Sequence, residues 1–196
     1  ALNCAKTFKL KKVDGILNFQ PVASASAAIC KAGPQVPVIA IDIEQDPCQD
    51  AFMGADNSYA GEVTGKALGE HFKKTFNCEF DSFISLEDYG VGVVNAARMG
   101  GYRTGFESVC GKIGDKLIQI DAGRLEPALA KMKDALTTLP NAKKIAVVAI
   151  NDEGIQGAFA AARAIGRDQD IYAGSQGAAA SAHCDIAKNP NWIGAT

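Results

Sequence analysis

Residues 145–166 read IAVVAINDEGIQGAFAAARAIG, and this stretch decides the predicted fold. Its first six residues, Ile145–Ile150, are all apolar, which is typical of a strand buried on both faces of a parallel sheet. After a polar turn, small apolar residues continue at helical spacing to Gly166, a residue that commonly ends helices. The stretch therefore predicts a strand, a turn and a helix, the repeating unit of an α/β fold.

The same pattern recurs along the chain. Six apolar runs end on polar side chains, and five are followed by a helix-like segment; the runs are Val13–Leu17, Val36–Ile41, Phe83–Leu86, Leu117–Ile120, Ile145–Ile150 and Ile171–Gly174. This alternation predicts doubly wound parallel sheets of the α/β class. The rhythm breaks over residues 44–58, so we expect a domain boundary there. Asn57 and Ser58 are good N-caps for a helix predicted over 59–75.

Polar side chains stand where the predicted strands end. They include Gln20, Asp42, Glu87, Tyr89, Asn151 and Gln176. The carboxyl ends of parallel strands meet at one edge of a sheet, and ligands bind there. We therefore predict a ligand site at this edge. For Asn151 the alternative is that it only caps the following helix.

Composition and charge exclude several classes of function. The chain has 196 residues, 47% hydrophobic and 21% charged, with a net charge of −2. No basic footprint for nucleic acid is present, and no apolar run approaches the roughly 20 residues of a membrane span. His71, His183 and the cysteines complete no zinc-ligand spacing, so we predict neither a metal site nor a cofactor.

Six cysteines at wide spacing indicate disulfides in an oxidising compartment, the alternative being buried free thiols in a cytosolic protein. Cys78 follows the helix over 59–75, and Cys110 ends a helix predicted over 91–109. Adjacent βα units place both at the end of the layer away from the ligand edge. We therefore expect the pair Cys78–Cys110 first, and Cys30–Cys48 second.

Two glycine-rich features of residues 90–105 bear on function and packing. Gly90–Asn95 partly matches the dinucleotide fingerprint G-x-G-x-x-G, but Asn95 replaces the third glycine, and Glu87 and Asp88 would repel a pyrophosphate. No nucleophile, metalloprotease or P-loop motif is present, so we do not predict an enzyme. The other glycines of the helix over 91–109 permit close backbone approach.

Five stretches, in order and spacing, resemble the type I periplasmic sugar-binding proteins and the core domains of lac-repressor-like regulators. They are VDGILNFQP, VPVIAIDIE, GADNSYAGEVTGKALGEHF, NAARMGGYRTGFES and AINDEGIQGAFAAARAIG. The resemblance implies two doubly wound lobes joined by a hinge, with the ligand between them. It also implies a chain lacking both family ends, with a partial amino-terminal lobe over 1–54 and a nearly complete second lobe over 55–196.

The resemblance implies sugar contacts for four residues: Arg98, Asn151, Asp42 and Gln20. Two departures from the ribose-binding pattern stand out. Ile43 replaces the arginine that follows the family's aspartate, and Gln176 replaces a carboxylate. Amide, carboxylate and guanidinium groups suit hydroxyls that both donate and accept hydrogen bonds.

Aromatic faces pack against sugar C–H groups, for which Phe19 and Tyr89 are candidates; a place in the core is the alternative for Tyr89. The predicted ligand-binding residues are therefore Gln20, Asp42, Glu87, Tyr89, Arg98, Asn151 and Gln176.

The resemblance implies the solute-binding component of an ABC-type importer. Its ligand would be a sugar or sugar-like polyol, its partner a membrane permease, and its location the periplasm or cell surface. Alternatives are a regulator's effector-binding core, a sensor that presents its ligand to a membrane receptor, and an NAD(P)-dependent oxidoreductase.

Overall fold

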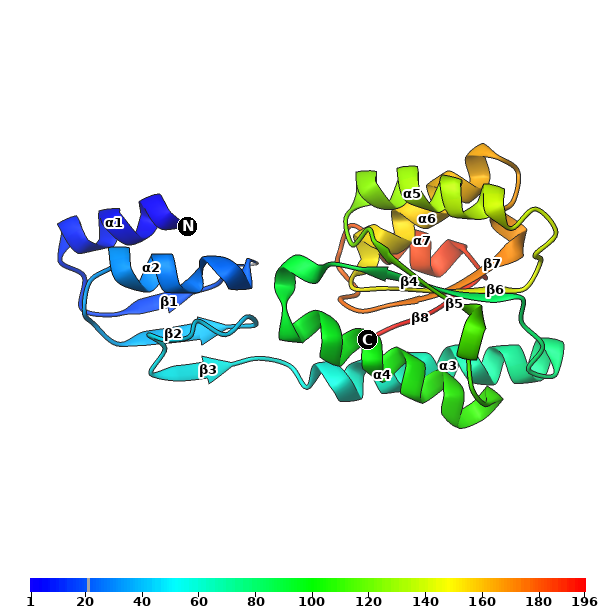
Figure 1. Ribbon diagram of the computed structural model, residues 1–196, viewed down its shortest axis with the longest axis horizontal. Coiled ribbons are helices and arrows are strands. Elements are labelled where there is room, and N and C mark those ends of the chain that lie inside the picture. Colours follow the sequence, from blue (N-terminus) through cyan, green and yellow to red (C-terminus); the bar gives the residue numbers. More distant parts are fainter. Residues whose placement is uncertain (21) are drawn as a thin grey trace. The chain divides into compact units, whose positions relative to one another are not determined.

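The computed structural model describes residues 1–20 and 22–196, which form two compact units (Figure 1). Unit 1 comprises Ala1–Asp56 and Tyr89–Val94, and unit 2 comprises Asn57–Asp88 and Asn95–Thr196. Each unit contains a sheet in which the paired strands run parallel. The predicted α/β fold class is therefore confirmed.

Unit 1 is built on a three-stranded sheet of order β1-β2-β3 with two helices on one side (Figure 1). Its elements are α1 (Leu2–Lys11), β1 (Ile16–Asn18), a 3₁₀ turn (Ala23–Ala25), α2 (Ser26–Ala32), β2 (Val38–Ile41) and β3 (Ala51–Met53). Along β2, Val38 and Ala40 are buried, whereas Ile39 is exposed. This period of two places one face of the sheet under the helices and leaves the other accessible.

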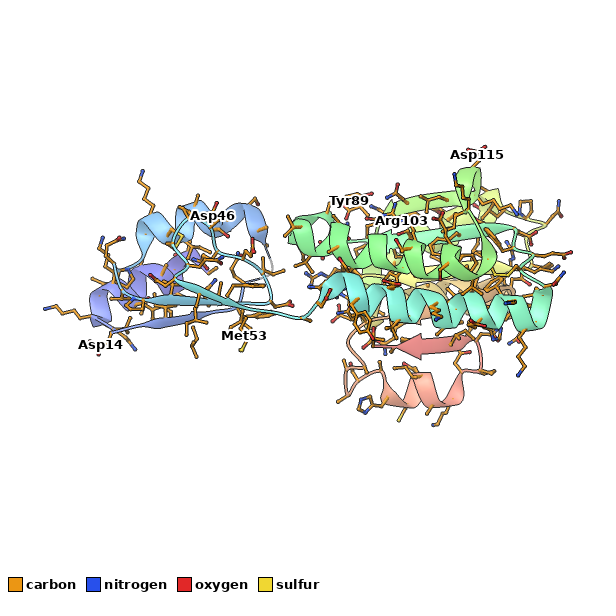
Figure 2. All side chains as sticks on the ribbon, turned by 90° about the horizontal axis from the view of Figure 1, so that it is seen from below. Asp14, Asp46, Met53, Tyr89, Arg103 and Asp115 are labelled. Atoms are coloured by element: carbon orange, nitrogen blue, oxygen red, sulfur yellow. A yellow bond between two sulfur atoms is a disulfide. The ribbon has the colours of Figure 1, made fainter. Side chains whose placement is uncertain are left out.

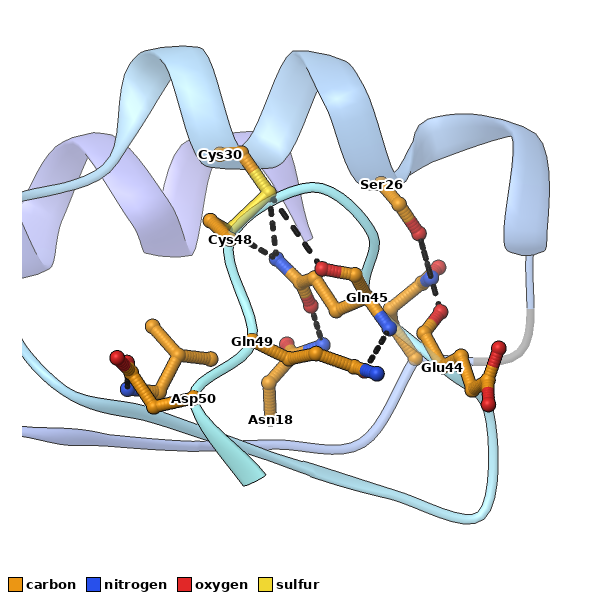
Figure 3. The surroundings of a disulfide bond; sticks show 10 residues. Asn18, Ser26, Cys30, Glu44, Gln45, Cys48, Gln49 and Asp50 are labelled. Atoms are coloured by element: carbon orange, nitrogen blue, oxygen red, sulfur yellow. Dashed lines mark hydrogen bonds between the residues drawn. A yellow bond between two sulfur atoms is a disulfide. The ribbon is translucent and has the colours of Figure 1, made fainter. Parts of the chain in front are cut away.

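The Cys30–Cys48 disulfide ties α2 to the loop between β2 and β3 (Figure 3). Beside it lies the buried side chain of Gln45, whose Nε2 is 3.8 Å from the Cys30 sulfur and 3.7 Å from the Cys48 sulfur. Asn18 donates from its side-chain amide to Gln45 Oε1, so the loop is also fastened to β1. The disulfide predicted second is thus present.

Unit 2 is built on a five-stranded parallel sheet of order β5-β4-β6-β7-β8. Its strands are β4 (Ser82–Glu87), β5 (Leu117–Asp121), β6 (Ile145–Ala149), β7 (Ile171–Ser175) and β8 (Trp192–Ala195), and its helices are α3 (Asn57–Phe76), α4 (Val93–Cys110), α5 (Leu125–Thr138), α6 (Asp152–Ala164) and α7 (His183–Lys188). Short 3₁₀ turns span Gly114–Lys116 and Asp168–Asp170, and a third, Tyr89–Val91, belongs to unit 1. Helices α3 and α4 lie on one face of the sheet, and α5 and α6 on the other (Figure 1).

The core of unit 2 follows from its apolar strands. All five residues of β6 are buried, as the run that opens residues 145–166 predicts. Ile84, Leu86 and Val147 belong to the cluster that α5 and α6 close, whereas Phe83 stacks edge-on against Phe106 of α4 on the opposite face. The sheet is therefore doubly wound, with a hydrophobic layer on each side.

Helices α3 and α4 approach each other through glycines. A Cβ atom at Gly65 of α3 would lie 2.1 Å from the Tyr102 carbonyl oxygen, and one at Gly105 of α4 would lie 2.1 Å from the Glu62 carbonyl oxygen. Backbones this close leave no room for a side chain, which confirms the close approach predicted from the glycines of α4. Burial between these layers raises the pKa of the Tyr102 phenol.

The Cys78–Cys110 disulfide joins the carboxyl ends of α3 and α4, with a Cα–Cα distance of 5.1 Å. This is the pair predicted first. It lies at the end of the layer opposite the carboxyl edge of the sheet, because both helices run back from that edge.

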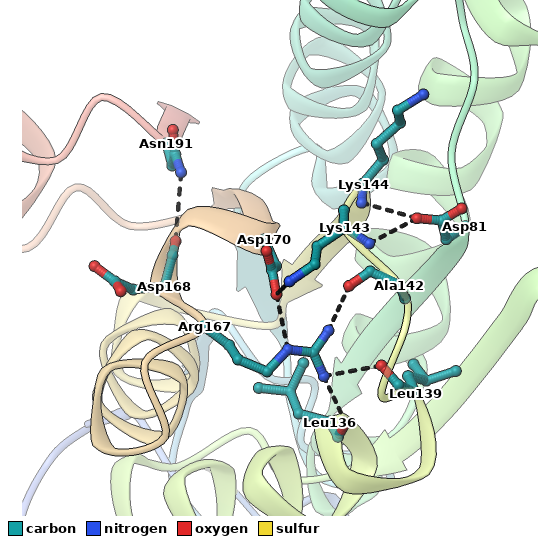
Figure 4. Close-up of polar contacts among 10 residues, drawn as sticks. All are labelled: Asp81, Leu136, Leu139, Ala142, Lys143, Lys144, Arg167, Asp168, Asp170 and Asn191. Atoms are coloured by element: carbon teal, nitrogen blue, oxygen red, sulfur yellow. Dashed lines mark hydrogen bonds and ion pairs between the residues drawn. The ribbon is translucent and has the colours of Figure 1, made fainter.

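A network centred on Arg167 closes the amino-terminal end of the β6 and β7 strands (Figure 4). Arg167 donates from Nη1 to the carbonyl oxygens of Leu136 and Leu139 at the end of α5, at 2.7 and 2.8 Å. Its Nε lies 2.7 Å from Asp170 Oδ2, which Lys143 also reaches at 3.2 Å. The guanidinium thereby adds a side-chain donor to two carbonyl oxygens at the end of α5, which also accept the backbone N–H groups of Leu139 and Ala142.

Asp81 completes this end of the sheet by accepting the backbone N–H groups of Lys143 and Lys144 at 2.7 and 3.0 Å (Figure 4). Burial alone would raise the pKa of the Asp81 carboxyl. The two N–H donors, together with the positive charges of Lys144 and Lys116, outweigh burial and hold the pKa below its usual value.

Candidate ligand site at the carboxyl edge of the unit 2 sheet

The carboxyl ends of the unit 2 strands carry the polar residues that the sequence places there. Glu87 ends β4, Asn151 and Asp152 follow β6, and Gln176 follows β7. The strands are parallel neighbours, so these residues lie along one edge of one sheet. In open α/β sheets this is the edge at which ligands bind.

Arg98, Asn57 and Gln176 form a hydrogen-bonded cluster at this edge. Arg98 donates from Nε and Nη2 to Asn57 Oδ1 at 3.1 and 2.7 Å, and Gln176 Nε2 donates to the same oxygen at 3.3 Å. Arg98 Nη1 also donates to the carbonyl oxygen of Ile150, directly after β6. The structure thus brings together two predicted site residues, Arg98 and Gln176, through a third, Asn57, that sequence reasoning missed.

The contact between α3 and α4 positions Asn57 and Arg98. Asn57 is the first residue of α3, and Arg98 lies in the second turn of α4. A Cβ atom at Gly61 would lie 2.3 Å from the Arg98 carbonyl oxygen, so the two helices touch one turn from the cluster. The sequence signal for Asn57 was its helix-capping chemistry, which gave no sign of its partner on another helix.

A second set of hydrogen bonds fixes the loop that carries Gln176. The buried carboxylate of Asp152 accepts from Ser175 Oγ at 2.6 Å and from the Ala179 backbone N–H at 2.7 Å. Trp192 Nε1 donates to Ser175 Oγ at 3.1 Å. The residues that precede and follow Gln176 in the loop are therefore fixed, and Gln176 itself is only 8% exposed.

Asn151 caps helix α6, since its Oδ1 accepts the Gly154 backbone N–H at 3.0 Å. The capping role named as the alternative is present. Capping uses the oxygen, so a contact between Asn151 and a ligand would be made by its Nδ2 group. Its place in a ligand site remains a prediction.

Glu87 lies in a separate buried network and is 2% exposed. Its Oε1 accepts from Ser85 Oγ at 2.9 Å and Gln119 Nε2 at 2.8 Å, and its Oε2 accepts from Asn95 Nδ2 at 2.6 Å. Arg103 of α4, labelled in Figure 2, places Nη2 3.7 Å from Glu87 Oε1. The structure does not join Glu87 to the Arg98 cluster, and its ligand role remains a prediction.

Three predicted site residues belong to unit 1. Gln20 is buried, donates from Nε2 to Ser26 Oγ at 3.2 Å and accepts the Val22 N–H at 3.0 Å. Asp42 follows β2 with a left-handed backbone φ of 64°, and Tyr89 is 54% exposed. Exposure excludes Tyr89 from the core, which was the alternative for this residue. Ligand contacts by all three remain predictions.

The partial dinucleotide fingerprint has a structural explanation. Asn95, in place of the third glycine, donates to Glu87 Oε2 and accepts the Asp88 backbone N–H at 2.9 Å on Oδ1. Its side chain ties the start of α4 to the end of β4 and stands beside a buried carboxylate. This arrangement disfavours the pyrophosphate of a dinucleotide.

Two searches of the described residues bear on other classes of site. Within residues 1–20 and 22–196, no group of three or more histidine, cysteine, aspartate or glutamate side chains is arranged to hold a metal ion. No helix in that described part is both long and apolar enough to cross a membrane.

Comparison with known proteins identifies relatives of this architecture. A family model described as a periplasmic binding protein domain matches residues 5–188. No curated protein matches the sequence. A solved structure of an ABC transporter solute binding protein from Mycobacterium smegmatis with bound glycerol superposes with a TM-score of 0.80 at 18% identity, covering 97% of this chain and 64% of that one.

Two further structures are similar. A periplasmic solute binding protein of an ABC transporter from Actinobacillus succinogenes, with bound D-allose, gives a TM-score of 0.73 at 22% identity, covering 97% of this chain and 67% of that one. An ABC transporter solute binding protein from Bacillus halodurans with bound myo-inositol gives a TM-score of 0.75 at 22% identity, covering 97% of this chain and 65% of that one. At these identities the likeness shows the fold, and the chain spans about two thirds of the length of these proteins.

Proposed function

From the premise that this chain belongs to the periplasmic binding protein domain family, we propose that it captures a neutral sugar or polyol for an ABC importer. The family consists of solute-binding proteins. Capture would be reversible and would involve no covalent chemistry, so we propose a binding protein and not an enzyme.

The observation that carries this proposal is the Arg98, Asn57 and Gln176 cluster at the ligand edge of the unit 2 sheet. It offers a fixed guanidinium donor and a buried amide, the groups that pair with hydroxyls. Glycerol, D-allose and myo-inositol, bound by three proteins of similar fold, are all neutral polyhydroxy compounds. We therefore propose that class of ligand here.

We propose contacts with the ligand for Arg98, Gln176 and Asn151 Nδ2. For Gln20 and Asp42 the same role rests on the sequence resemblance, and for Glu87 and Tyr89 it rests on their place after a predicted strand. Gln20 and Glu87 are engaged in hydrogen bonds within their own surroundings, and Tyr89 stands exposed. These four are secondary candidates.

The partner and the compartment follow from the same premise. We propose that a membrane permease of an ABC importer receives the ligand, and that the protein works in the periplasm or at the cell surface. Two disulfides support an oxidising compartment, because cytosolic thiols are kept reduced.

Thermal melting against a panel of sugars, polyols and NAD(P) tests the proposal. A ligand at 100 times its Kd stabilises the folded state by about 2.7 kcal/mol. For a protein of this size that corresponds to a rise in Tm of about 5–10 °C. We expect such a rise with at least one neutral sugar or polyol, followed by a Kd from calorimetry.

Arg98→Met is the matched test of the site, with Arg163→Met on the exposed surface of α6 as its control. The Arg98 variant should lose the ligand-dependent rise in Tm, and the Arg163 variant should keep it. A rise with NAD(P) alone, or none with any neutral polyhydroxy compound, would contradict the proposed function.

A further inference from the structure

One buried acceptor at the ligand edge has no donor among the residues that the structure describes. Gln176 Oε1 is inaccessible to solvent and makes no hydrogen bond within the described residues, although Gln176 Nε2 is bonded to Asn57. A buried acceptor without a donor destabilises the folded state, so such atoms are rare in folded proteins. A donor from outside the chain would remove that destabilisation.

The orientation of the Gln176 amide follows from chemistry along a chain of three side chains. Arginine only donates hydrogen bonds, so the Asn57 atom that faces Arg98 Nε and Nη2 must be the oxygen. The Gln176 atom 3.3 Å from that same oxygen must then be the nitrogen, since two oxygens would repel. Oε1 is therefore the atom directed away from Asn57.

The start of this chain is itself fixed. Arg98 Nη1 donates to the Ile150 carbonyl oxygen at the end of β6. The main chain on either side of Gln176 is held as well, because Ser175 and Ala179 both bond to Asp152. Rotation of the Gln176 side chain would break its bond to Asn57.

We propose that Asn57 is a positioning residue. Its Oδ1 accepts hydrogen bonds from both Arg98 and Gln176, and this leaves Gln176 Oε1 oriented to accept a hydrogen bond from a ligand hydroxyl. This inference rests on the proposed function and adds to it the residue that orients the acceptor. It also defines the ligand group that Gln176 binds, a hydrogen-bond donor.

Three variants separate positioning from simple support of the fold. Asn57→Asp keeps an oxygen toward Arg98 and Gln176, whereas Asn57→Leu removes it. Gln176→Glu keeps the shape but places a carboxylate oxygen against Asn57 Oδ1. Asn191→Leu is the matched control, since Asn191 is 9% exposed, much like Asn57 at 8%, and its side chain bonds to the Asp168 carbonyl oxygen instead.

Calorimetry with D-allose, myo-inositol and glycerol, and with singly deoxygenated forms of whichever binds, measures the effect. We expect Asn57→Leu and Gln176→Glu to raise Kd about 10-fold, and Asn57→Asp and Asn191→Leu to change it less than about threefold. One deoxygenated analogue should bind the wild type about 10-fold more weakly than its parent, and Asn57→Leu should abolish that difference. Equal Kd values for Asn57→Leu and Asn57→Asp would overturn the proposal.

A ligand-free measurement keeps this proposal separate from the proposed function. In ¹H–¹⁵N spectra, the Gln176 side-chain amide, assigned from Gln176→Glu, should exchange slowly in the wild type and in Asn57→Asp, and rapidly in Asn57→Leu. If no compound binds the wild type, the proposed function fails, and these spectra still decide the positioning role. Unchanged Gln176 exchange in Asn57→Leu would overturn it.

Discussion

The two ends of the unit 2 sheet each hold a central arginine, but they use it differently. At the amino-terminal end, Arg167 is bonded to helix carbonyl oxygens and paired with Asp170, and the described network closes on itself (Figure 4). At the carboxyl end, Arg98 orients Asn57, which orients Gln176, and the series stops at an acceptor with no donor in the described structure.

This difference distinguishes a structural network from a recognition site. A closed network of buried polar groups stabilises the fold and offers nothing to a ligand. A network that leaves one acceptor without a donor lowers the stability of the folded state, but it holds that acceptor in a fixed orientation. A ligand that donates a hydrogen bond to the acceptor removes the destabilisation. The prediction that follows is that the Arg167 end governs stability and the Arg98 end governs binding.

Arg167→Met should have the largest effect on stability. Removing the guanidinium leaves Asp170, which is 8% exposed, paired with Lys143. It also removes the side-chain donor from the carbonyl oxygens of Leu136 and Leu139, which keep only backbone N–H donors in the described structure. We expect a loss of about 3 kcal/mol, or a fall in Tm of about 6–12 °C. Urea unfolding and calorimetry measure it.

The Kd of the bound sugar or polyol should not change in Arg167→Met below its Tm. Weakened binding in a folded Arg167→Met protein would show that the two ends are not independent.

Gly65→Ala should have the next largest effect, because it tests the helix contact that positions Asn57 and Arg98. A Cβ atom 2.1 Å from the Tyr102 carbonyl oxygen must push α3 away from α4. We expect a loss of about 2 kcal/mol in stability together with weaker binding, since both helices carry the cluster. Thermal unfolding and Kd measurements on the same sample test both parts.

Gly100→Ala is the matched control in α4, where a Cβ atom meets nothing within 4 Å. This substitution should stabilise the protein by up to about 1 kcal/mol, because alanine favours helices. If Gly65→Ala were as stable as Gly100→Ala, the close helix contact would not be a constraint.

Arg98→Met should show the reverse of the Arg167 variant. Loss of the guanidinium frees Asn57 to rotate and removes a ligand donor, so we expect Kd to rise at least about 10-fold, equivalent to about 1.4 kcal/mol. The fall in Tm without ligand should be smaller than for Arg167→Met. A fall in Tm as large as that of Arg167→Met with unchanged Kd would reverse the assignment of the two ends.

Acidification should give the smallest effect, through His71. Burial first, and then Lys74, lower the pKa of this imidazole, which packs 5.2 Å from the Tyr172 ring. The unfolded chain therefore takes up a proton at higher pH than the folded protein does. The contribution of neutral His71 to stability is fully present above about pH 6.5, and it is lost as the pH falls through the folded pKa of the imidazole.

His71→Phe should flatten this loss in urea unfolding between pH 7 and 5, and His183→Gln should retain it. His183 is the only other histidine of the chain, and it is exposed, with Nε2 2.7 Å from the Ala178 carbonyl oxygen. An unchanged pH dependence in His71→Phe would contradict the prediction.

Much of the fold was predictable because it depends on periodicity. The apolar run that opens residues 145–166 is β6, the centre of the unit 2 sheet, and the helix after it is α6. The pair Cys30–Cys48 joins α2 to a loop and does not follow from periodicity. The pair Cys78–Cys110 does, because alternating strands and helices place helix ends at defined sides of a layer. Local pattern and chain order carry that information.

The candidate site was predictable only in part. The sequence by itself determined the α/β class and the polar row after the strands, to which Asn151 and Gln176 belong, whereas Arg98, which lies in a helix, was predicted from the family resemblance. Only the tertiary structure decided that Arg98 meets Asn57 across two helices, that Asn57 turns Gln176, and that Glu87 lies in a separate network. The physical reason is that a hydrogen bond needs two groups within about 3 Å, and distances between residues far apart in sequence are set by helix packing, here through glycines, and not by local pattern.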